Sequence, residues 1–384
     1  VPWLSSLALA IFCWLFITFW GAALVMAWAI GMTLYEKAKG KRQKAKEKGI
    51  SNFQFSTVNI ALLRVIFAVA LWCGLEAIWS LGALWWTSLS YTQSPHNLAI
   101  LQLSQLSGPS TITAAIVAVN GLIAEGLLLV IDHRSFGGEQ IEVGRFYQHP
   151  SLLLLNFALF SFMSLHLIGW CMYARPLINN ENNGIKIGII QGNVPNEIKL
   201  YPLGWRKAIE GYTEGYKRLA SQGVDAVLIP ETALPFIWDE QVRSRSSFYQ
   251  AILQEKIPAW VGAFGKKGSS FTNSLFSVTG TGETVSEYDK AKLVPLGEYI
   301  PFERFLGRFI DRLSPLDAHL VAGNPDQIFD TPFGQAIVGI CYDSAFSEHF
   351  RRQAARGGEF IITASNNAHY SKTMPAPPPA QHVL

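Results

Sequence analysis

Four long apolar stretches occupy the first half of this chain of 384 residues. They cover residues 3–35, 58–80, 109–131 and 151–173, and none has polar residues that repeat with the period of an amphipathic helix. Because a helix of about 20 apolar residues crosses the hydrocarbon core of a bilayer, the stretches predict four transmembrane helices. Helices buried inside a large soluble protein would need polar faces, which these stretches lack. The first stretch exceeds the length of an upright span, so we expect it to be tilted or broken near Gly21.

A basic segment between the first two stretches predicts how the helices are oriented. Lysine and arginine account for seven of the twelve residues from Lys37 to Lys48, and such segments stay on the cytoplasmic side of a membrane. Three crossings separate this segment from Asn179, so the polar second half is expected on the opposite side. In a bacterium with two membranes, this predicts a multi-pass protein of the inner membrane with its second half in the periplasm.

Arg64 and Glu76 are ionisable residues within the second apolar stretch. Ionisable residues in a transmembrane segment usually face protein or water. Twelve positions separate the two residues, which is more than three helical turns. We therefore expect no direct pair between them, and a structural role for each.

The second half alternates short β-type runs with helical segments, which predicts an α/β layered domain. We place a transmembrane helical domain at residues 1–178 and a periplasmic domain at residues 179–384. The chain begins in an apolar stretch without Met, so further residues are expected upstream. Strands are expected at residues 185–191, 226–230, 259–264, 274–278, 284–288, 335–341 and 360–365, turns at 265–268 and 280–282, and helices at 205–221 and 346–356.

Composition argues against several classes of function. The net charge is only +3 and no basic stripe interleaves with aromatic residues, so nucleic-acid binding is not expected. The histidines show no metal-ligand spacing such as H-E-x-x-H, so we expect no metal and no cofactor. We expect surface or core positions for the four histidines of the second half, which are His319, His349, His369 and His382.

Three reactive side chains follow predicted strands in the second half. Glu231 lies between two prolines after a buried run, where stiff backbone suits a general base, although a helix cap would explain it as well. Lys290 lies in a charged segment, which a solvated surface would also explain. Cys341 is the only thiol of this half. It ends an apolar strand before a probable helix, whose amide groups would lower the pKa of an exposed thiol. A buried core cysteine is the alternative.

The order and spacing of these three residues resemble the nitrilase superfamily. Shared segments include the opening strand at residues 187–193, the Asn273–Ser274 pair and the run Leu-Val-Pro-Leu-Gly-Glu that ends at Glu298. The last run and the segment Pro-Glu-Thr-Ala-Leu-Pro from Pro230 are similar to one branch, the apolipoprotein N-acyltransferases. Tyr91-Thr92-Gln93 in the first half also looks like that family. The resemblance implies a nitrilase-like αββα sandwich after an α-helical transmembrane domain.

The resemblance also implies a role for each matching residue. Cys341 would carry the acyl group, Glu231 would act as general base, and Lys290 would stabilise the tetrahedral intermediate together with the backbone amide after Cys341. Glu298 would be a further essential carboxylate. The supporting positions are Asn273, Tyr342 and Asp343. The implied substrates are a phospholipid acyl donor and a diacylglyceryl apolipoprotein acceptor, and the implied enzyme is a membrane-embedded monomer.

Two positions depart from the acyltransferase pattern. The family usually has Glu after the Cys-Tyr pair, where this chain has Asp343, and Trp after Lys199, where this chain has Leu200. Asp is typical of soluble nitrilases and amidases, so a membrane-anchored carbon–nitrogen hydrolase with the same three residues is the alternative. A catalytically silent scaffold is the other alternative, because the chain stops before the last strands and the last membrane span expected of the family.

Overall fold

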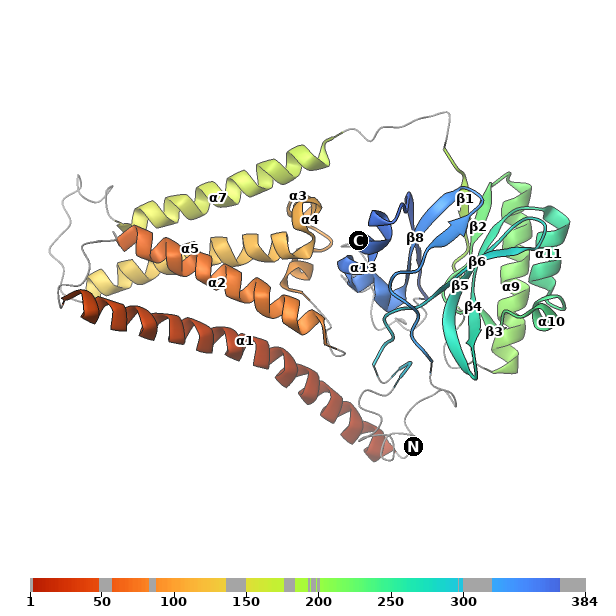
Figure 1. The fold of residues 1–384 in the computed structure, drawn as a ribbon, viewed down its shortest axis with the longest axis horizontal. Helices are drawn as coiled ribbons and strands as arrows, with labels where there is room; N and C mark the ends of the chain where they lie inside the picture. The colour runs from red at the N-terminus through yellow and green to blue at the C-terminus, as the bar shows by residue number, and fades with distance from the viewer. Residues whose placement is uncertain are drawn as a thin grey trace. The chain divides into compact units, whose positions relative to one another are not determined.

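The computed structural model of the chain describes residues 3–47, 57–82, 88–135, 150–175, 184–192, 194, 198, 201–295, 297–299 and 320–366. The chain divides into two compact units, one of residues 1–176 and one of residues 177–382 (Figure 1). Some positions singled out in the sequence lie outside the described residues. These are Lys48 in the basic segment, Leu200, His319 and the residues after Asn366.

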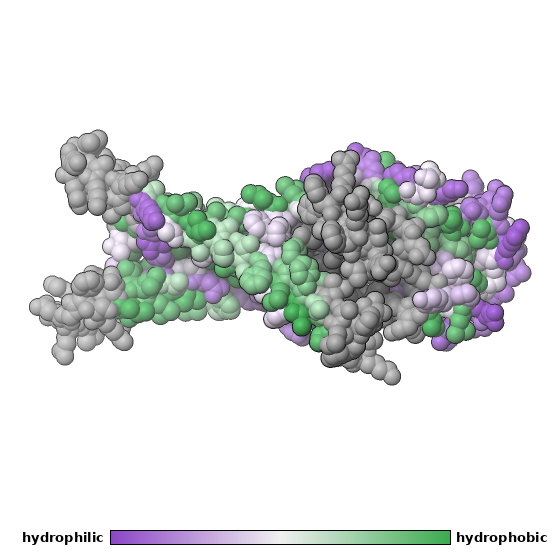
Figure 2. Space-filling view, turned by 90° about the horizontal axis from the view of Figure 1, so that it is seen from below, coloured by the Kyte–Doolittle hydropathy of each residue, from purple (hydrophilic) through white to green (hydrophobic). Residues whose placement is uncertain are grey.

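The first unit contains the four predicted transmembrane helices. They are α1 (Trp3–Glu47), α2 (Thr57–Ser80), α5 (Pro109–Ser135) and α7 (Pro150–Tyr173), and all four are long and apolar enough to cross a membrane. Large apolar side chains cover the surface of this unit, whereas the surface of the second unit is mostly polar (Figure 2). The expected break at Gly21 is absent, because α1 continues through it. A glycine inside a helix costs only about 1 kcal/mol, less than leaving backbone groups unpaired in lipid.

Small residues bring the helices of the first unit close together. A side chain at Gly126 of α5 would collide with Leu155 of α7, and a side chain at Gly169 of α7 would collide with the backbone of Ala99. Small residues at such contacts are typical of helices that associate in a membrane. The short helices between α2 and α5 are η1 (Leu89–Gln93), α3 (Leu98–Gln102) and α4 (Ser104–Ser107).

The ionisable residues of α2 bind different partners, as their spacing predicted. Arg64 donates to Glu36 of α1 at 2.7 Å and to both carboxylate oxygens of Glu125 of α5 at 2.9 Å. Glu76 instead accepts hydrogen bonds from the Leu89 N–H at 2.7 Å. It also accepts from the hydroxyls of Ser88 and Thr113. Arg64 therefore joins three helices, and Glu76 holds the start of η1.

The second unit contains two sheets. The larger has six strands in the order β1-β2-β4-β5-β6, with β3 paired to β4, and the smaller has the order β7-β8-β9. Strands β1, β2 and β4 are parallel, β4, β5 and β6 form an antiparallel meander, and β8 is parallel to β9. The strands are β1 (Ile187–Ile189), β2 (Ala226–Leu228), β3 (Leu234–Ile237), β4 (Ala259–Lys267), β5 (Ser270–Val278), β6 (Thr284–Asp289), β7 (Phe329–Thr331), β8 (Gly334–Ile340) and β9 (Phe360–Ala364).

Helices cover the outer faces of both sheets, which confirms the nitrilase-like αββα sandwich. Helices α9 (Pro202–Ser221) and α11 (Ser247–Glu255) pack on the larger sheet. A second apolar core lies between the two sheets, where Trp260 and Leu275 of one meet Val338 and Ile362 of the other. On the smaller sheet, the Phe350 ring of α13 (Ser347–Ala355) lies against Gly339. Two further short helices are α10 (Glu240–Arg243) and η2 (Cys341–Ala345).

Some elements differ from the sequence predictions. The turn expected at residues 265–268 is wrong for most of its length, because β4 continues to Lys267 and pairs with β5 as far as Ser270. The turn falls at Gly268, whose φ of +63° favours glycine. Strands β3 and β7 and helix α11 were not predicted. Strands of three or four residues are too short for a period-2 pattern to identify them.

Candidate active site

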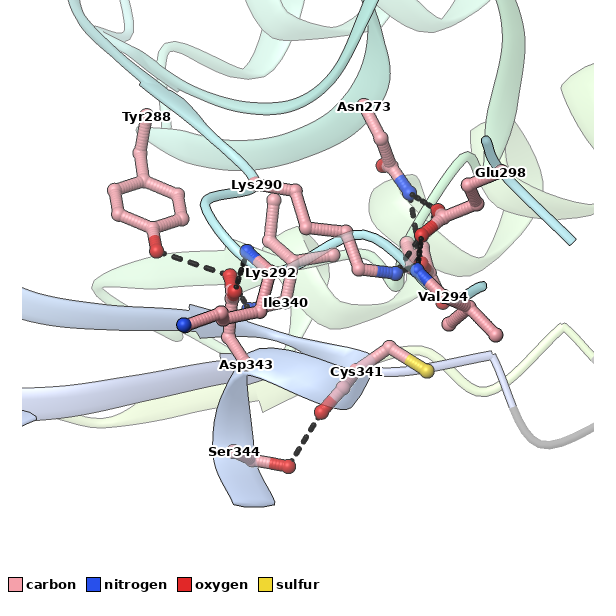
Figure 3. A network of polar contacts seen from close by, with 11 residues as sticks. Asn273, Tyr288, Lys290, Lys292, Val294, Glu298, Ile340, Cys341, Asp343 and Ser344 are labelled. Atoms are coloured by element: carbon pink, nitrogen blue, oxygen red, sulfur yellow. Dashed lines mark hydrogen bonds and ion pairs between the residues drawn. The ribbon is translucent and has the colours of Figure 1, made fainter. Parts of the chain in front are cut away.

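Glu231, Lys290 and Cys341 meet at the carboxyl ends of three strands. Glu231 follows β2, Lys290 follows β6 and Cys341 follows β8. The Lys290 ammonium lies 2.8 Å from Glu231 Oε1, and the Glu231 carboxylate is hydrogen bonded to the Cys341 thiol. Figure 3 shows Cys341 beside this cluster. Residues separated by about fifty or more positions are therefore brought within direct contact.

A second carboxylate and an amide complete the cluster. Glu298 Oε1 lies 2.9 Å from the Lys290 ammonium, and Glu298 Oε2 accepts from the Val294 N–H at 2.8 Å. Asn273 Nδ2 donates to Glu231 Oε1 at 2.8 Å and to Glu298 Oε1 at 2.9 Å. Lysine and asparagine thus bind the same two carboxylate oxygens (Figure 3).

Burial and charge set the protonation of the cluster. The Lys290 side chain is 1% exposed, and its burial lowers its pKa. The carboxylates of Glu231 and Glu298 outweigh this effect and raise the pKa above its ordinary value. Burial also raises the pKa of Cys341 to about 12, and the Glu231 charge adds to this effect while Lys290 opposes it. The expectation of an exposed thiol with a lowered pKa is therefore wrong for this conformation. Cys341 needs a base to ionise it.

The backbone is bent sharply where two of these side chains emerge. Cys341 has a φ of +50°, and Thr232, directly after Glu231, has a φ of +44°. Positive φ angles are unfavourable for residues with a Cβ atom and gather at functional sites. Gly262 of β4 lies against the Pro230 carbonyl, where a side chain would collide. The bend at Cys341 turns the chain from β8 into η2, and the close contact at Gly262 admits the turn that carries Glu231.

Asp343 stabilises the turn that carries the thiol. Its side chain is fully buried, and it accepts from the Lys292 N–H at 2.6 Å, the Ile340 N–H at 3.1 Å and the Tyr288 hydroxyl at 2.9 Å. Burial raises the pKa of Asp343 to about 6, although these bonds oppose the shift. Asp343 therefore connects the end of β6, which carries Lys290, to the turn of Cys341 (Figure 3).

Three polar residues behind Asp343 were missed in the sequence analysis. The Tyr288 hydroxyl also contacts His349 Nε2, which in turn lies 3.0 Å from Gln353 Nε2. Gln353 pairs with both the N–H and the carbonyl of Val338 in β8 at 2.8 Å. His349 is buried, one of the two positions predicted for it, and burial lowers its pKa to about 4. Tyr288 lies two positions before Lys290, so the two side chains are expected on the same side of the chain. This spacing was the one sequence signal for the network among the described residues.

Tyr342 directly follows Cys341, and its ring packs edge-on against Phe346 with 5.0 Å between the ring centroids. Within the residues that the structure describes, no three His, Cys, Asp or Glu side chains are grouped to hold a metal ion. The described cluster can thus supply a nucleophile, a base and a cation from protein side chains.

Comparisons with known proteins identify the family of the chain. Residues 186–380 match the carbon–nitrogen hydrolase family. An apolipoprotein N-acyltransferase from Nostoc sp. is 49% identical over the whole chain, which covers 69% of that relative. The chain belongs to the apolipoprotein N-acyltransferase family. A second member from Synechocystis sp. is 46% identical over the whole chain, which covers 70% of that relative.

A solved amidase from Nesterenkonia sp. is 20% identical, with a TM-score of 0.35, over 47% of this chain and 64% of the amidase. Membership of the N-acyltransferase family makes this chain a membrane-bound acyltransferase of the carbon–nitrogen hydrolase superfamily.

Proposed function

We propose that this chain transfers an acyl group from a phospholipid to the N-terminal amine of a diacylglyceryl-cysteine lipoprotein, through a thioester on Cys341. The observation that carries the proposal is the contact of Glu231 with both Lys290 and Cys341 in a member of the N-acyltransferase family. In this proposal, a helical domain of residues 1–178 anchors the enzyme, and residues 179–384 carry the catalytic groups.

The first step forms the acyl-enzyme. Cys341 Sγ attacks an ester carbonyl of the phospholipid while Glu231 accepts the thiol proton. The carbonyl oxygen becomes negative in the tetrahedral intermediate, where the Lys290 ammonium and the N–H of Tyr342 stabilise it. The carbon–oxygen bond of the ester then breaks, and the leaving alkoxide takes the proton from Glu231. The products are a Cys341 thioester and a lysophospholipid.

The second step consumes the thioester. The acceptor amine attacks the thioester carbonyl, and Glu231 accepts a proton from the amine nitrogen. The carbon–sulfur bond breaks as the amide forms, and the proton on Glu231 returns to the Cys341 sulfur. Because a thioester is more reactive toward amines than an ester, splitting the transfer into two steps lowers each barrier.

The proposed setting is the inner membrane of a bacterium, with the catalytic residues on the periplasmic side and the protein acting as a monomer. Four candidate membrane helices and the basic segment between the first two support this setting. Both substrates carry acyl chains and reside in the bilayer, which fits an enzyme built on a helical anchor.

A carbon–nitrogen hydrolase is the second candidate, favoured by Asp343 in place of the Glu usual in the acyltransferases. In the structure, Asp343 accepts hydrogen bonds from Tyr288, Lys292 and Ile340. In the proposal it supports the turn of Cys341 in either reaction. The acceptor, water or amine, separates the two candidates.

Intact mass spectrometry tests the proposal. Protein in detergent is incubated with a phospholipid that bears a labelled acyl chain, and a diacylglyceryl-cysteine peptide is then added. We expect a label on the wild type that is absent from Cys341→Ala and moves to the peptide. Label that is released only to water would establish the hydrolase instead, and folded wild-type protein that never acquires label would refute the mechanism.

A further inference from the structure

The amide of Asn273 is oriented at a cost to stability. The residue is 3% exposed, and its Nδ2 donates to both Glu231 and Glu298. Its Oδ1 is buried and has no hydrogen-bond partner among the described residues. A buried acceptor without a partner is destabilising. Rotating the amide by 180° would be worse, because Oδ1 would then face two carboxylates. The carboxylates therefore fix the orientation of the amide.

The charges of the cluster explain why a neutral donor is useful there. Glu231 and Glu298 carry two negative charges and Lys290 carries one positive charge, so the cluster has a net charge of −1 when all three are ionised. A second cation would stabilise both carboxylates but would also oppose protonation of the base. An amide supplies two N–H donors without adding charge. The base is thus held in place and still attracts a proton.

The fold places Asn273 where it can act on all three charged groups. Its backbone carbonyl accepts from the Lys290 N–H at 2.8 Å, so β5 also holds the residue that carries the cation. Glu231 Oε1 already accepts from Lys290 and Asn273.

We propose that Asn273 is a positioning residue that aligns Glu231 and Glu298 on Lys290 and stabilises the carboxylate of Glu231, while Glu231 remains able to accept the thiol proton. This inference rests on the proposed function, because it assigns Asn273 a part in forming the Cys341 thioester. Among the described residues, the titratable groups that face Glu231 are Lys290, Glu298 and Cys341.

The test is the pH dependence of thioester formation in Asn273→Ala. Removing two N–H donors destabilises the ionised form of Glu231 and raises its pKa, so the acid limb of the rate profile should move to higher pH by about one unit. The rate at the wild-type optimum should fall roughly 10- to 100-fold. Asn273→Asp has the same shape but replaces the donors with a third carboxylate, and it should shift the limb further.

Ser277→Ala is the matched control. Ser277 lies on the same face of β5, and its hydroxyl is also buried and has no partner among the described residues. Its loss should leave both the rate and the pH profile unchanged. A folded Asn273→Ala or Asn273→Asp whose rate falls equally at every pH, with the acid limb unmoved, would overturn the inference. Failure of the wild type itself to form a thioester would instead refute the proposed function.

Discussion

Cys341 lies among groups that oppose its ionisation, which makes the base necessary. Burial, the largest cause, raises the pKa of its thiol to about 12. The carboxylates of Glu231 and Glu298 raise it as well, and only Lys290 lowers it. Near neutral pH the resting thiol is therefore protonated, and a thiolate forms only as its proton moves to a base. A cysteine of this kind is protected from unwanted alkylation or oxidation.

This arrangement predicts that Glu231→Gln makes the thiol more acidic while it stops acyl transfer. Removing a negative charge beside the sulfur lowers the pKa of Cys341, by about one unit or more. The pH dependence of iodoacetamide labelling, followed by intact mass with the other three cysteines replaced by alanine, measures this pKa. The exposed Glu283→Gln should leave it unchanged. An unchanged or higher pKa in Glu231→Gln would show that Glu231 does not act on the thiol.

Asp343 illustrates how a departure from the family pattern is accommodated. Its side chain is fully buried and receives three hydrogen bonds from nearby groups, so an additional methylene group has little room. Asp343→Glu, which installs the family's usual residue, should destabilise the protein by about 1–3 kcal/mol. It should also slow thioester formation, because the Cys341 turn moves. Thermal unfolding and single-turnover labelling measure both effects.

Asp330→Glu is the control for this substitution, because Asp330 is exposed on β7. Full activity and unchanged unfolding of Asp343→Glu would mean that the size of the side chain does not position the nucleophile.

The sequence predicted the three residues that follow strands better than the buried residues that support them, such as Tyr288 and His349. Glu231 and Cys341 each follow an apolar run, and Lys290 follows the mixed strand β6. The Tyr288–His349 contact joins a strand to a helix about sixty positions later, and no local pattern indicates such a pair. The raised pKa of Cys341 was also missed, because burial depends on how the two sheets pack.

At the scale of elements, Arg64 connects helices α1, α2 and α5. Arg64→Leu would remove the cation that binds Glu125, whose side chain is largely buried, and breaking such a pair should cost about 2 kcal/mol. We expect a fall of roughly 5 °C or more in the midpoint of thermal unfolding in detergent. Arg64→Lys keeps the positive charge but loses the planar guanidinium group. It should therefore lower the midpoint of thermal unfolding by less.

Two comparisons check the cause of that fall. Adding Glu125→Gln to Arg64→Leu should restore part of the stability, because fewer unpaired charges remain. Arg175→Leu, an exposed position after α7, should have little effect. Equal stability of Arg64→Leu and the wild type would mean that the three-helix contact does not hold the unit together.

The bounds of the helices were predicted best in the first unit, where a membrane span requires an apolar sequence. The apolar runs gave α2, α5 and α7 to within a few residues, since a span must be apolar over its whole length. In the second unit, β4 extends past its last predicted residue because the ladder with β5 continues through Gly265–Thr272 and Lys266–Phe271. Hydrogen bonds to a partner strand, rather than local composition, determine where such a strand ends.

At the scale of the whole molecule, the distribution of charge predicts which side of the membrane each segment faces. The basic segment from Lys37 to Lys48 precedes three of the four candidate spans. Because basic segments resist translocation, an odd number of crossings predicts that the second unit lies on the opposite side. The acceptor amine would then be acylated outside the cytoplasm.

Site-specific labelling tests this orientation in cells. Ser221→Cys in the catalytic unit and Lys44→Cys in the basic segment are made in a protein whose four native cysteines are replaced by serine. A membrane-impermeant maleimide applied to cells with a permeabilised outer membrane should label Ser221→Cys and should label Lys44→Cys only after lysis. Labelling of both positions before lysis would mean that an even number of helices crosses between them. One of the three helices α2, α5 and α7 would then lie in the membrane without spanning it, and Glu231, Lys290 and Cys341 would share a side with the basic segment.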